Sequence, residues 1–155
     1  MKIDFFTSAD ADDLAPLLED MQAYYSVFCP PRETIVATLR GLPAGAEIFV
    51  ARLDSVIVGF AGFGANYAGP GLKPGFFLKD LYVTRSARGH GIGRKLMAKI
   101  ASIAVERGFT RVDWTASRGD EKLILFYDTL GAAMKEDRVF FRLDGDRLRA
   151  LAETL

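Results

Sequence analysis

One stretch of the sequence is the most informative about the fold: Arg88-Gly89-His90-Gly91-Ile92-Gly93-Arg94. It stands between a strand-like segment, residues 76–84, and an amphipathic segment that ends near Arg107. Glycines at alternate positions let the backbone turn sharply and expose its N–H groups, because no Cβ blocks the approach. The helix that follows directs the positive end of its dipole and its unpaired amides toward this loop. The stretch therefore predicts an anion site suited to a pyrophosphate.

Length and composition limit the class of protein. The chain has 155 residues, of which 50% are hydrophobic, and this is enough for one domain with a sizeable core. Its 20 basic and 20 acidic residues balance, so we expect neither nucleic acid nor a membrane surface as a partner. The single cysteine, Cys29, excludes an intramolecular disulfide and suits a reducing compartment. The start of the chain is too short and too charged for a signal peptide, and a cytoplasmic location is expected.

Hydrophobic spacing predicts the elements before the glycine loop. Residues 3–6 form a short strand, and apolar residues from Leu14 to Tyr25 recur at helical spacing. Pro30-Pro31 opens a second helix, which Gly41 closes. Two strands, residues 48–53 and 56–64, are joined as a hairpin through Asp54-Ser55. Residues 65–75, rich in glycine and proline, are expected to form a loop.

The strand before the loop and the helix after it are strongly patterned. In the strand, simple alternation places four residues on one face: Phe76, Leu78, Asp80 and Tyr82. The helix ends at Gly108 and carries one apolar stripe, made of Ile92, Leu96, Ile100 and Ile103.

The last third of the chain continues the mixture of strands and helices. Strands are predicted at residues 111–116, 132–135 and 139–143, and helices at 121–130 and 144–155. About seven strands then alternate irregularly with helices, which implies an α/β (α+β) fold: a mixed sheet with helices on both faces. The absence of repeats and linkers predicts a single domain over residues 1–155.

Two familiar phosphate-binding loops do not fit the glycine stretch. The dinucleotide fingerprint needs a third glycine three positions after the second, and Gly91 and Gly93 lead only to Leu96. The Walker loop needs Gly-Lys-Ser/Thr, whereas Gly93 is followed by Arg94-Lys95-Leu96. A tight strand-to-helix turn without any ligand stays open as the alternative.

Two motifs together resemble the GNAT N-acetyltransferases. Residues 88–93 are similar to the Arg/Gln-x-x-Gly-x-Gly/Ala loop of that family, and the hydrophobic strand Leu81-Tyr82-Val83 precedes them. Phe126-Tyr127, in a short helix that ends in Leu130-Gly131-Ala132, is similar to the second signature. The run Phe77-Leu78-Lys79-Asp80-Leu81-Tyr82-Val83 most resembles the diamine (spermidine/spermine) branch. This resemblance covers nearly the whole chain and implies a mostly antiparallel sheet that is splayed at its centre.

The resemblance implies acetyl-CoA as cosubstrate, with no metal. Its pyrophosphate would lie on the loop amides, and its pantetheine would pair with the preceding strand. The implied contact residues are Leu81, Tyr82, Val83, Arg88, Gly89, His90, Gly91, Ile92, Gly93, Arg94 and, further along the chain, Asp120.

Tyr127 is the candidate general acid. In the family this tyrosine lies near the CoA sulfur and protonates the leaving thiolate. A phenol has an ordinary pKa near ~10, so it is protonated and available at neutral pH. The bland alternative is that Phe126 and Tyr127 form an aromatic pair on a core-facing helix.

Two positions depart from the family pattern. Asp120 stands where members usually have asparagine, and a carboxylate accepts hydrogen bonds but donates none, which puts its contact with CoA in doubt. Lys79 stands where the diamine branch has a glutamate that receives the amine proton through water. A charged lysine is no base. We hypothesise that Lys79 meets a substrate carboxylate, which favours an amino acid or a carboxylated amine over spermidine.

The acceptor is expected to be a small-molecule primary amine of diamine or amino-acid type. Asp80 and Glu136 are candidates to receive its ammonium group, and Tyr24 lies where family substrates reach the protein. Each of these carboxylates has an alternative interpretation as a solvated surface group.

Other functions stay open beside this one. The chain could be an acyl-CoA-binding module without catalysis, for which Lys79 and Asp120 are the warning signs, or an acetyltransferase of protein N-termini or lysines. Many members of the family are homodimers, and the apolar residues Val139, Phe140 and Phe141 suit an interface.

Overall fold

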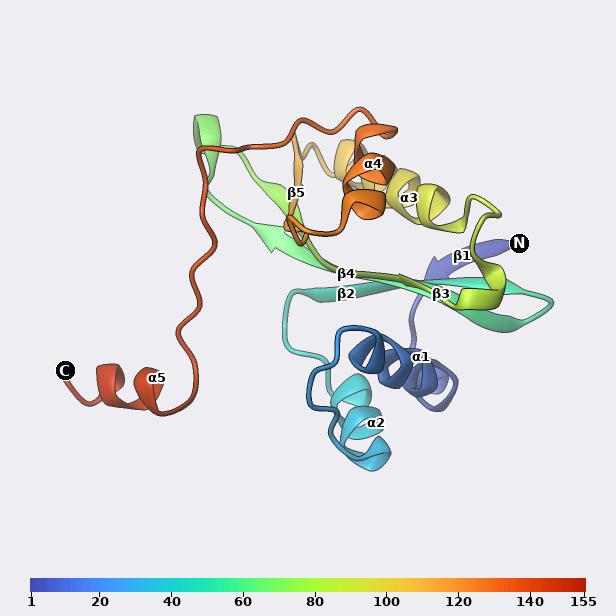
Figure 1. Ribbon diagram of the computed structural model, residues 1–155, viewed down its shortest axis with the longest axis horizontal. Helices are drawn as coiled ribbons and strands as arrows, with labels where there is room; N and C mark the ends of the chain where they lie inside the picture. The colour runs from blue at the N-terminus through green and yellow to red at the C-terminus, as the bar shows by residue number, and fades with distance from the viewer. The chain divides into compact units, whose positions relative to one another are not determined.

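The centre of the fold is a five-stranded sheet in the first of two compact units (Figure 1). The structure, a computed structural model, describes residues 1–155. It divides into Met1–Trp114 and Thr115–Leu155. The strands of the first unit, adjacent in this order, are β1 (Lys2–Phe5), β2 (Ala46–Leu53), β3 (Val56–Asn66), β4 (Gly75–Val83) and β5 (Val112–Trp114). Neighbouring strands are antiparallel except β4 and β5, which are parallel.

Helices cover both faces of this sheet, as the sequence predicts. In Figure 1, α1 (Ala11–Tyr24) and α2 (Arg32–Arg40) lie on one face and α3 (Ile92–Glu106) on the other. Three short 3-10 turns, η1 (Ser8–Asp10), η2 (Pro70–Leu72) and η3 (Arg85–Ala87), connect these elements. The second unit holds α4 (Glu121–Asp128) and α5 (Gly145–Ala152). None of these helices has the length and apolar composition that crossing a membrane requires.

Strand alternation builds a core on each face of the sheet. On β2, Val50 joins the apolar cluster under α1 and α2, while its neighbour Phe49 faces α3; both are 0% exposed. The predicted stripe of α3 is confirmed, because Ile92, Leu96, Ile100 and Ile103 are all buried. The face below α3 also carries a row of aromatic contacts that joins Phe49, Phe63, Phe76 and Phe109.

The hairpin predicted at Asp54-Ser55 is confirmed. Both residues have positive φ angles, 46° and 71°, as a two-residue turn with the twist of the flanking strands requires. The register starts with Leu53 opposite Val56 and shifts by one residue at Val58, which has no partner on β2. The turn therefore sets the pairing at its own end of the hairpin.

β4 carries a bulge at Lys79, which corrects the predicted alternation. Gly62 of β3 lies opposite Asp80, and Phe63 lies opposite Leu78, so Lys79 is an inserted residue with no partner. Before the bulge, Leu78 shares the α3 face with Phe63. After it, Asp80 shares the α1 face with Tyr82. The four residues predicted on one face therefore divide between the two faces of the sheet.

The sheet has five strands where about seven were predicted. Residues 132–135 and 139–143 form no strand, and the strand predicted at 111–116 is shortened to Val112–Trp114. Residues 139–143 have the β-branched and aromatic composition of a strand. A strand also needs a hydrogen-bonding neighbour, and no neighbouring strand is present in this chain.

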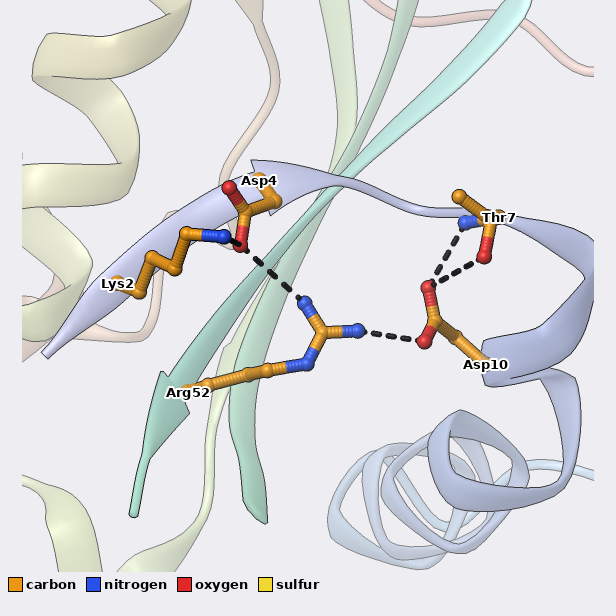
Figure 2. Close-up of polar contacts among 5 residues, drawn as sticks. All are labelled: Lys2, Asp4, Thr7, Asp10 and Arg52. Carbon is orange, nitrogen blue, oxygen red and sulfur yellow. Dashed lines mark hydrogen bonds and ion pairs between the residues drawn. The ribbon is translucent and has the colours of Figure 1, made fainter. Parts of the chain in front are cut away.

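An ion-pair network holds the start of the chain to the sheet (Figure 2). Arg52 of β2 contacts Asp10 of η1 at 2.6 Å and Asp4 of β1 at 3.6 Å. Asp10 also accepts a hydrogen bond of 2.8 Å from the backbone N–H of Thr7, and Lys2 pairs with Asp4 at 3.1 Å. Burial alone would raise the pKa of Asp10. The Thr7 amide and the Arg52 guanidinium outweigh it and hold the pKa below its usual range.

Candidate active site

The glycine loop leaves backbone amides open at the start of α3. Gly89 and Gly91 have φ angles of 82° and 72°, and a Cβ at either position would meet nothing within 4 Å. The first backbone bond of the helix runs from the N–H of Lys95 to the carbonyl of Gly91, at 3.0 Å. The amides of Ile92 and Gly93 therefore precede the helical ladder. Open amides at a positive helix end fit an anion such as a pyrophosphate.

Arg88 does not turn its side chain toward these amides. Its Nε donates a hydrogen bond of 2.9 Å to the carbonyl oxygen of Val83. Its guanidinium lies 5.2 Å from the ring centre of Tyr24 and 5.5 Å from that of Tyr82. Such cation–π contacts hold the end of β4 against the end of α1. The side chain of Arg88 thus helps to shape the loop.

His90 also stabilises the loop from within. Its Nδ1 lies 3.0 Å from the carbonyl oxygen of Arg88 and 3.3 Å from that of Ala87. Because a carbonyl only accepts hydrogen bonds, these contacts require the proton on Nδ1. The ring therefore helps to hold the turn between η3 and α3.

The second half of β4 has one unpaired edge. β5 pairs with Phe76, Phe77 and Leu78 only, while β3 continues along the opposite side of β4 to Val83. This is the splay that the resemblance implies. Residues 79–83 present backbone donors and acceptors on the side that β5 leaves, and an extended ligand with amide groups can add there as a strand does. Leu81, Tyr82 and Val83 lie on this open stretch.

Asp80 and Lys79 differ in their surroundings although they are neighbours. Lys79 is exposed. Asp80 is half-buried, and its Oδ2 lies over Gly62, 3.9 Å from the position that a Cβ there would occupy. Burial raises the pKa of Asp80, and the positive charge of Lys79 partly opposes this.

An open pocket of about 270 Å³ lies between α1 and the end of β4. It is lined by Asp20, Tyr24, Tyr82, Arg85 and Arg88. Tyr24 and Tyr82, predicted separately, meet in this pocket. Arg85 was not predicted, although a basic residue directly between a strand and a glycine loop is a usable signal. Glu19, the residue before Asp20 on α1, pairs with Arg32.

The remaining predicted residues belong to the second unit. Asp120 is the N-cap of α4, because its Oδ1 accepts a 3.0 Å hydrogen bond from the N–H of Leu123. Tyr127 is half-buried in α4, with its ring centre 5.2 Å from that of Phe126. Glu136 is exposed in the segment after the helix.

Three known proteins show what this chain is similar to. L-ornithine N5-acetyltransferase NATA1 of Arabidopsis thaliana is 30% identical over 143 residues, 92% of this chain and 58% of that protein. Tyramine N-feruloyltransferase 4/11 of Nicotiana tabacum is 33% identical over 100 residues, 64% of this chain and 44% of that protein. The solved structure of an integron cassette protein from V. cholerae has a TM-score of 0.88 and 27% identity, over 98% of this chain and 97% of that one.

The chain spans about half the length of the first curated relatives that it matches. A family match extends across both compact units. Residues 14–132, which include the glycine loop and Phe126-Tyr127, match the model of the acetyltransferase (GNAT) family. On this match, and with the splayed sheet and glycine loop in place, the chain belongs to the GNAT acetyltransferase family.

Proposed function

We propose that this chain is an N-acetyltransferase that moves the acetyl group of acetyl-CoA to a primary amine of a small molecule. The observation that carries the proposal is the open anion loop directly beside the unpaired edge of β4, in a chain of the GNAT family. We also propose that residues 1–155 act as one domain, because the family match crosses from the first unit to the second.

The residues present fit a CoA thioester. The amides from Gly89 to Arg94 suit its pyrophosphate, and the free edge at Leu81, Tyr82 and Val83 suits the amide groups of its pantetheine. When bound, acetyl-CoA supplies an activated acyl group. The chain holds that group beside the acceptor amine, which attacks it directly without an acyl-enzyme intermediate, so positioning provides much of the rate enhancement.

Tyr127 is proposed as the general acid that protonates the thiolate. A phenol is protonated at neutral pH and suits this role. We expect Tyr127→Phe to lower kcat by about 100-fold or more with little change in KM for acetyl-CoA. Tyr25→Phe, at an exposed tyrosine, is the matched control. If kcat of the Tyr127 variant stays within about threefold of wild type across pH, the role is wrong.

For the acceptor, Lys79 is proposed to contact a substrate carboxylate. Its exposed position on the bulge, beside the open edge of β4, supports this. The amines in the names of the two relatives differ in this group, because ornithine carries a carboxylate and tyramine does not. Ornithine and putrescine form a matched pair that differs only in the carboxylate. We expect a higher kcat/KM with ornithine. A higher kcat/KM with putrescine or spermidine would contradict the proposed contact between Lys79 and a substrate carboxylate.

A CoA-binding module without catalysis is the second candidate. The observations that favour it are Lys79, where the diamine branch has a glutamate, and Asp120, whose carboxylate caps α4. Release of free thiol from acetyl-CoA separates the two candidates when it is measured with ornithine, putrescine, spermidine, tyramine and a lysine-containing peptide. Turnover on a small amine supports the enzyme. CoA binding without turnover on any amine supports the module, and turnover on the peptide alone supports a protein acetyltransferase.

A further inference from the structure

Asp80 stands apart from the other half-buried carboxylates of the first unit. Four of these acids are each held by an arginine: Asp4 and Asp10 by Arg52, Glu19 by Arg32 and Glu47 by Arg107. Asp80 is half-buried on β4 with neither a hydrogen bond nor an ion pair. A carboxylate that loses water without gaining a partner is costly, so this placement points to a functional role.

The bulge decides where this carboxylate points. If Lys79 were a regular strand residue, alternation would turn Asp80 toward the α3 face with Phe76 and Leu78. With the bulge at Lys79, Asp80 shares the α1 face with Tyr82, a residue that lines the open pocket. Gly62 on the neighbouring strand has no side chain to cover Asp80. The carboxylate therefore lies on the same face as Tyr82, on the stretch of β4 that β5 leaves unpaired.

Few charges surround Asp80. β3 contributes no ionisable side chain, and α3 lies on the opposite face of the sheet. Asp113 of β5 is held by Arg111. The pocket groups from α1, β4, η3 and the loop are Asp20, Tyr24, Tyr82, Arg85 and Arg88. The neighbouring charge that opposes the effect of burial on the pKa of Asp80 is that of Lys79.

We propose that Asp80 is the general base that takes the proton from the acceptor ammonium, directly or through one water. This rests on the proposed acetyltransferase function. The N–H bond of the ammonium breaks and its proton passes to a carboxylate oxygen of Asp80. The freed lone pair of the nitrogen attacks the thioester carbon, the C–N bond forms, and the C–S bond breaks to release the thiolate. The thiolate takes a proton from Tyr127, the acetylated nitrogen loses its second proton to solvent, and Tyr127 regains a proton from solvent. Asp80 then gives the proton to solvent.

The first test is Asp80→Asn, which keeps the size of the side chain and removes the base. We expect kcat/KM for the amine to fall by about 100-fold or more and the acidic limb of its pH profile to disappear. Affinity for acetyl-CoA, measured by calorimetry, is expected to stay unchanged. Asp54→Asn, in the exposed hairpin turn, is the matched control and should keep both rate and profile.

The second test moves the titration of Asp80 without touching its carboxylate. Lys79→Gln removes the charge that lowers the pKa of Asp80, so the acidic limb should move to higher pH. Gly62→Ala adds a methyl group at an ordinary contact distance of 3.9 Å from Oδ2, displaces water, and should move the limb in the same direction. Lys79→Gln should move the acidic limb equally with ornithine and with putrescine, because the change acts on the pKa of Asp80. Loss of contact with a substrate carboxylate would instead raise KM for ornithine alone.

The possible outcomes distinguish failure of the Asp80 assignment from failure of the proposed acetyltransferase function. If the wild-type protein acetylates no amine, the proposed function fails. If the wild type turns over but Asp80→Asn keeps its acidic limb and a rate within about threefold, Asp80 is not the base and the function stands. A variant that lost its fold would show a lowered thermal midpoint and weakened acetyl-CoA binding. In that case Asp80→Glu, which keeps a carboxylate, should retain the acidic limb of the pH profile. If this variant lost the acidic limb, the assignment of Asp80 as the base would also be overturned.

Discussion

Gly91 holds the backbone angle on which the proposed anion site depends. Its φ of 72° suits glycine, and an alanine there is strained although its Cβ meets nothing within 4 Å. We expect Gly91→Ala to lower the free energy of unfolding by about 1–2 kcal/mol, and to weaken acetyl-CoA binding as the strained turn moves the amides of Ile92 and Gly93.

Gly108 provides the control for this prediction at the other end of α3. It has a φ of 73° and equally open surroundings, so Gly108→Ala carries the same strain far from the loop. Denaturant unfolding and calorimetry with acetyl-CoA measure the two effects. Both variants should lose similar stability, but only Gly91→Ala should lose affinity. Equal affinities would mean that the loop does not bind the cosubstrate.

Asp10 allows a pH test of the network in Figure 2. Burial opposes its ionisation, but the Thr7 amide and Arg52 lower its pKa in the folded chain. The folded pKa of Asp10 lies below its unfolded value, which is near ~3.9, so the ionised carboxylate stabilises the protein above that pH. This stabilisation is lost as pH falls through the folded pKa. We expect Asp10→Asn to cost about 1–2 kcal/mol at pH 7, with the two unfolding curves converging below about pH 4.

The exposed pair of Asp12 and Arg40 serves as the comparison for Asp10. The side chains are 67% and 55% exposed, so water screens their attraction. Asp12→Asn is therefore expected to change the free energy of unfolding by less than about 0.5 kcal/mol at any pH. If Asp12→Asn lowered the free energy of unfolding as much as Asp10→Asn does, the Arg52 network would stabilise the protein no more than an exposed ion pair.

Among the elements, the start of β4 depends on a glycine that Arg111 encloses. A Cβ at Gly75 would lie 2.5 Å from Cγ of Arg111 and 2.9 Å from its carbonyl oxygen. That carbonyl accepts the 3.0 Å hydrogen bond from the N–H of Phe76 that begins the β4–β5 pairing. Gly75→Ala is thus expected to cost about 1–3 kcal/mol by forcing the strands apart. Gly41→Ala, with one contact at 3.6 Å, should be nearly neutral, and equal midpoints in thermal unfolding would contradict this account.

These elements also show what the sequence can and cannot predict. The stripe of α3 and the Asp54-Ser55 turn depend on local spacing, and both are confirmed. The glycine loop turns into α3 where the sequence predicts, while its role as an anion site stays a prediction. The bulge at Lys79 could not be predicted, because an inserted residue is defined only by the register of β3 against β4. Alternation alone placed Asp80 with Phe76, on the wrong face. The sequence therefore predicts which residues form the candidate site, but it does not predict the orientation of the Asp80 carboxylate.

The segment after α4 raises the question of assembly. Val139, Phe140 and Phe141 have a strand-like composition but are 76%, 60% and 85% exposed, and α5 buries no residue. Large apolar side chains gathered in this way mark an interaction surface. We predict that a second copy of the chain covers them, with the unpaired backbone of residues 139–143 adding to a strand of the partner.

Energetics make this prediction sensitive to small changes. Burying each of the three side chains stabilises a dimer by about 1.5–3 kcal/mol per copy, while association costs about 4–15 kcal/mol. Because these amounts are comparable, Val139→Asp with Phe141→Asp should convert a dimer to a monomer. Val56→Asp, at a valine 63% exposed near the hairpin turn, should leave it dimeric. Sedimentation equilibrium distinguishes these states, and a wild-type chain that stays monomeric at about 100-fold above its assay concentration would contradict the prediction, because mass action would by then have populated a dimer of this strength.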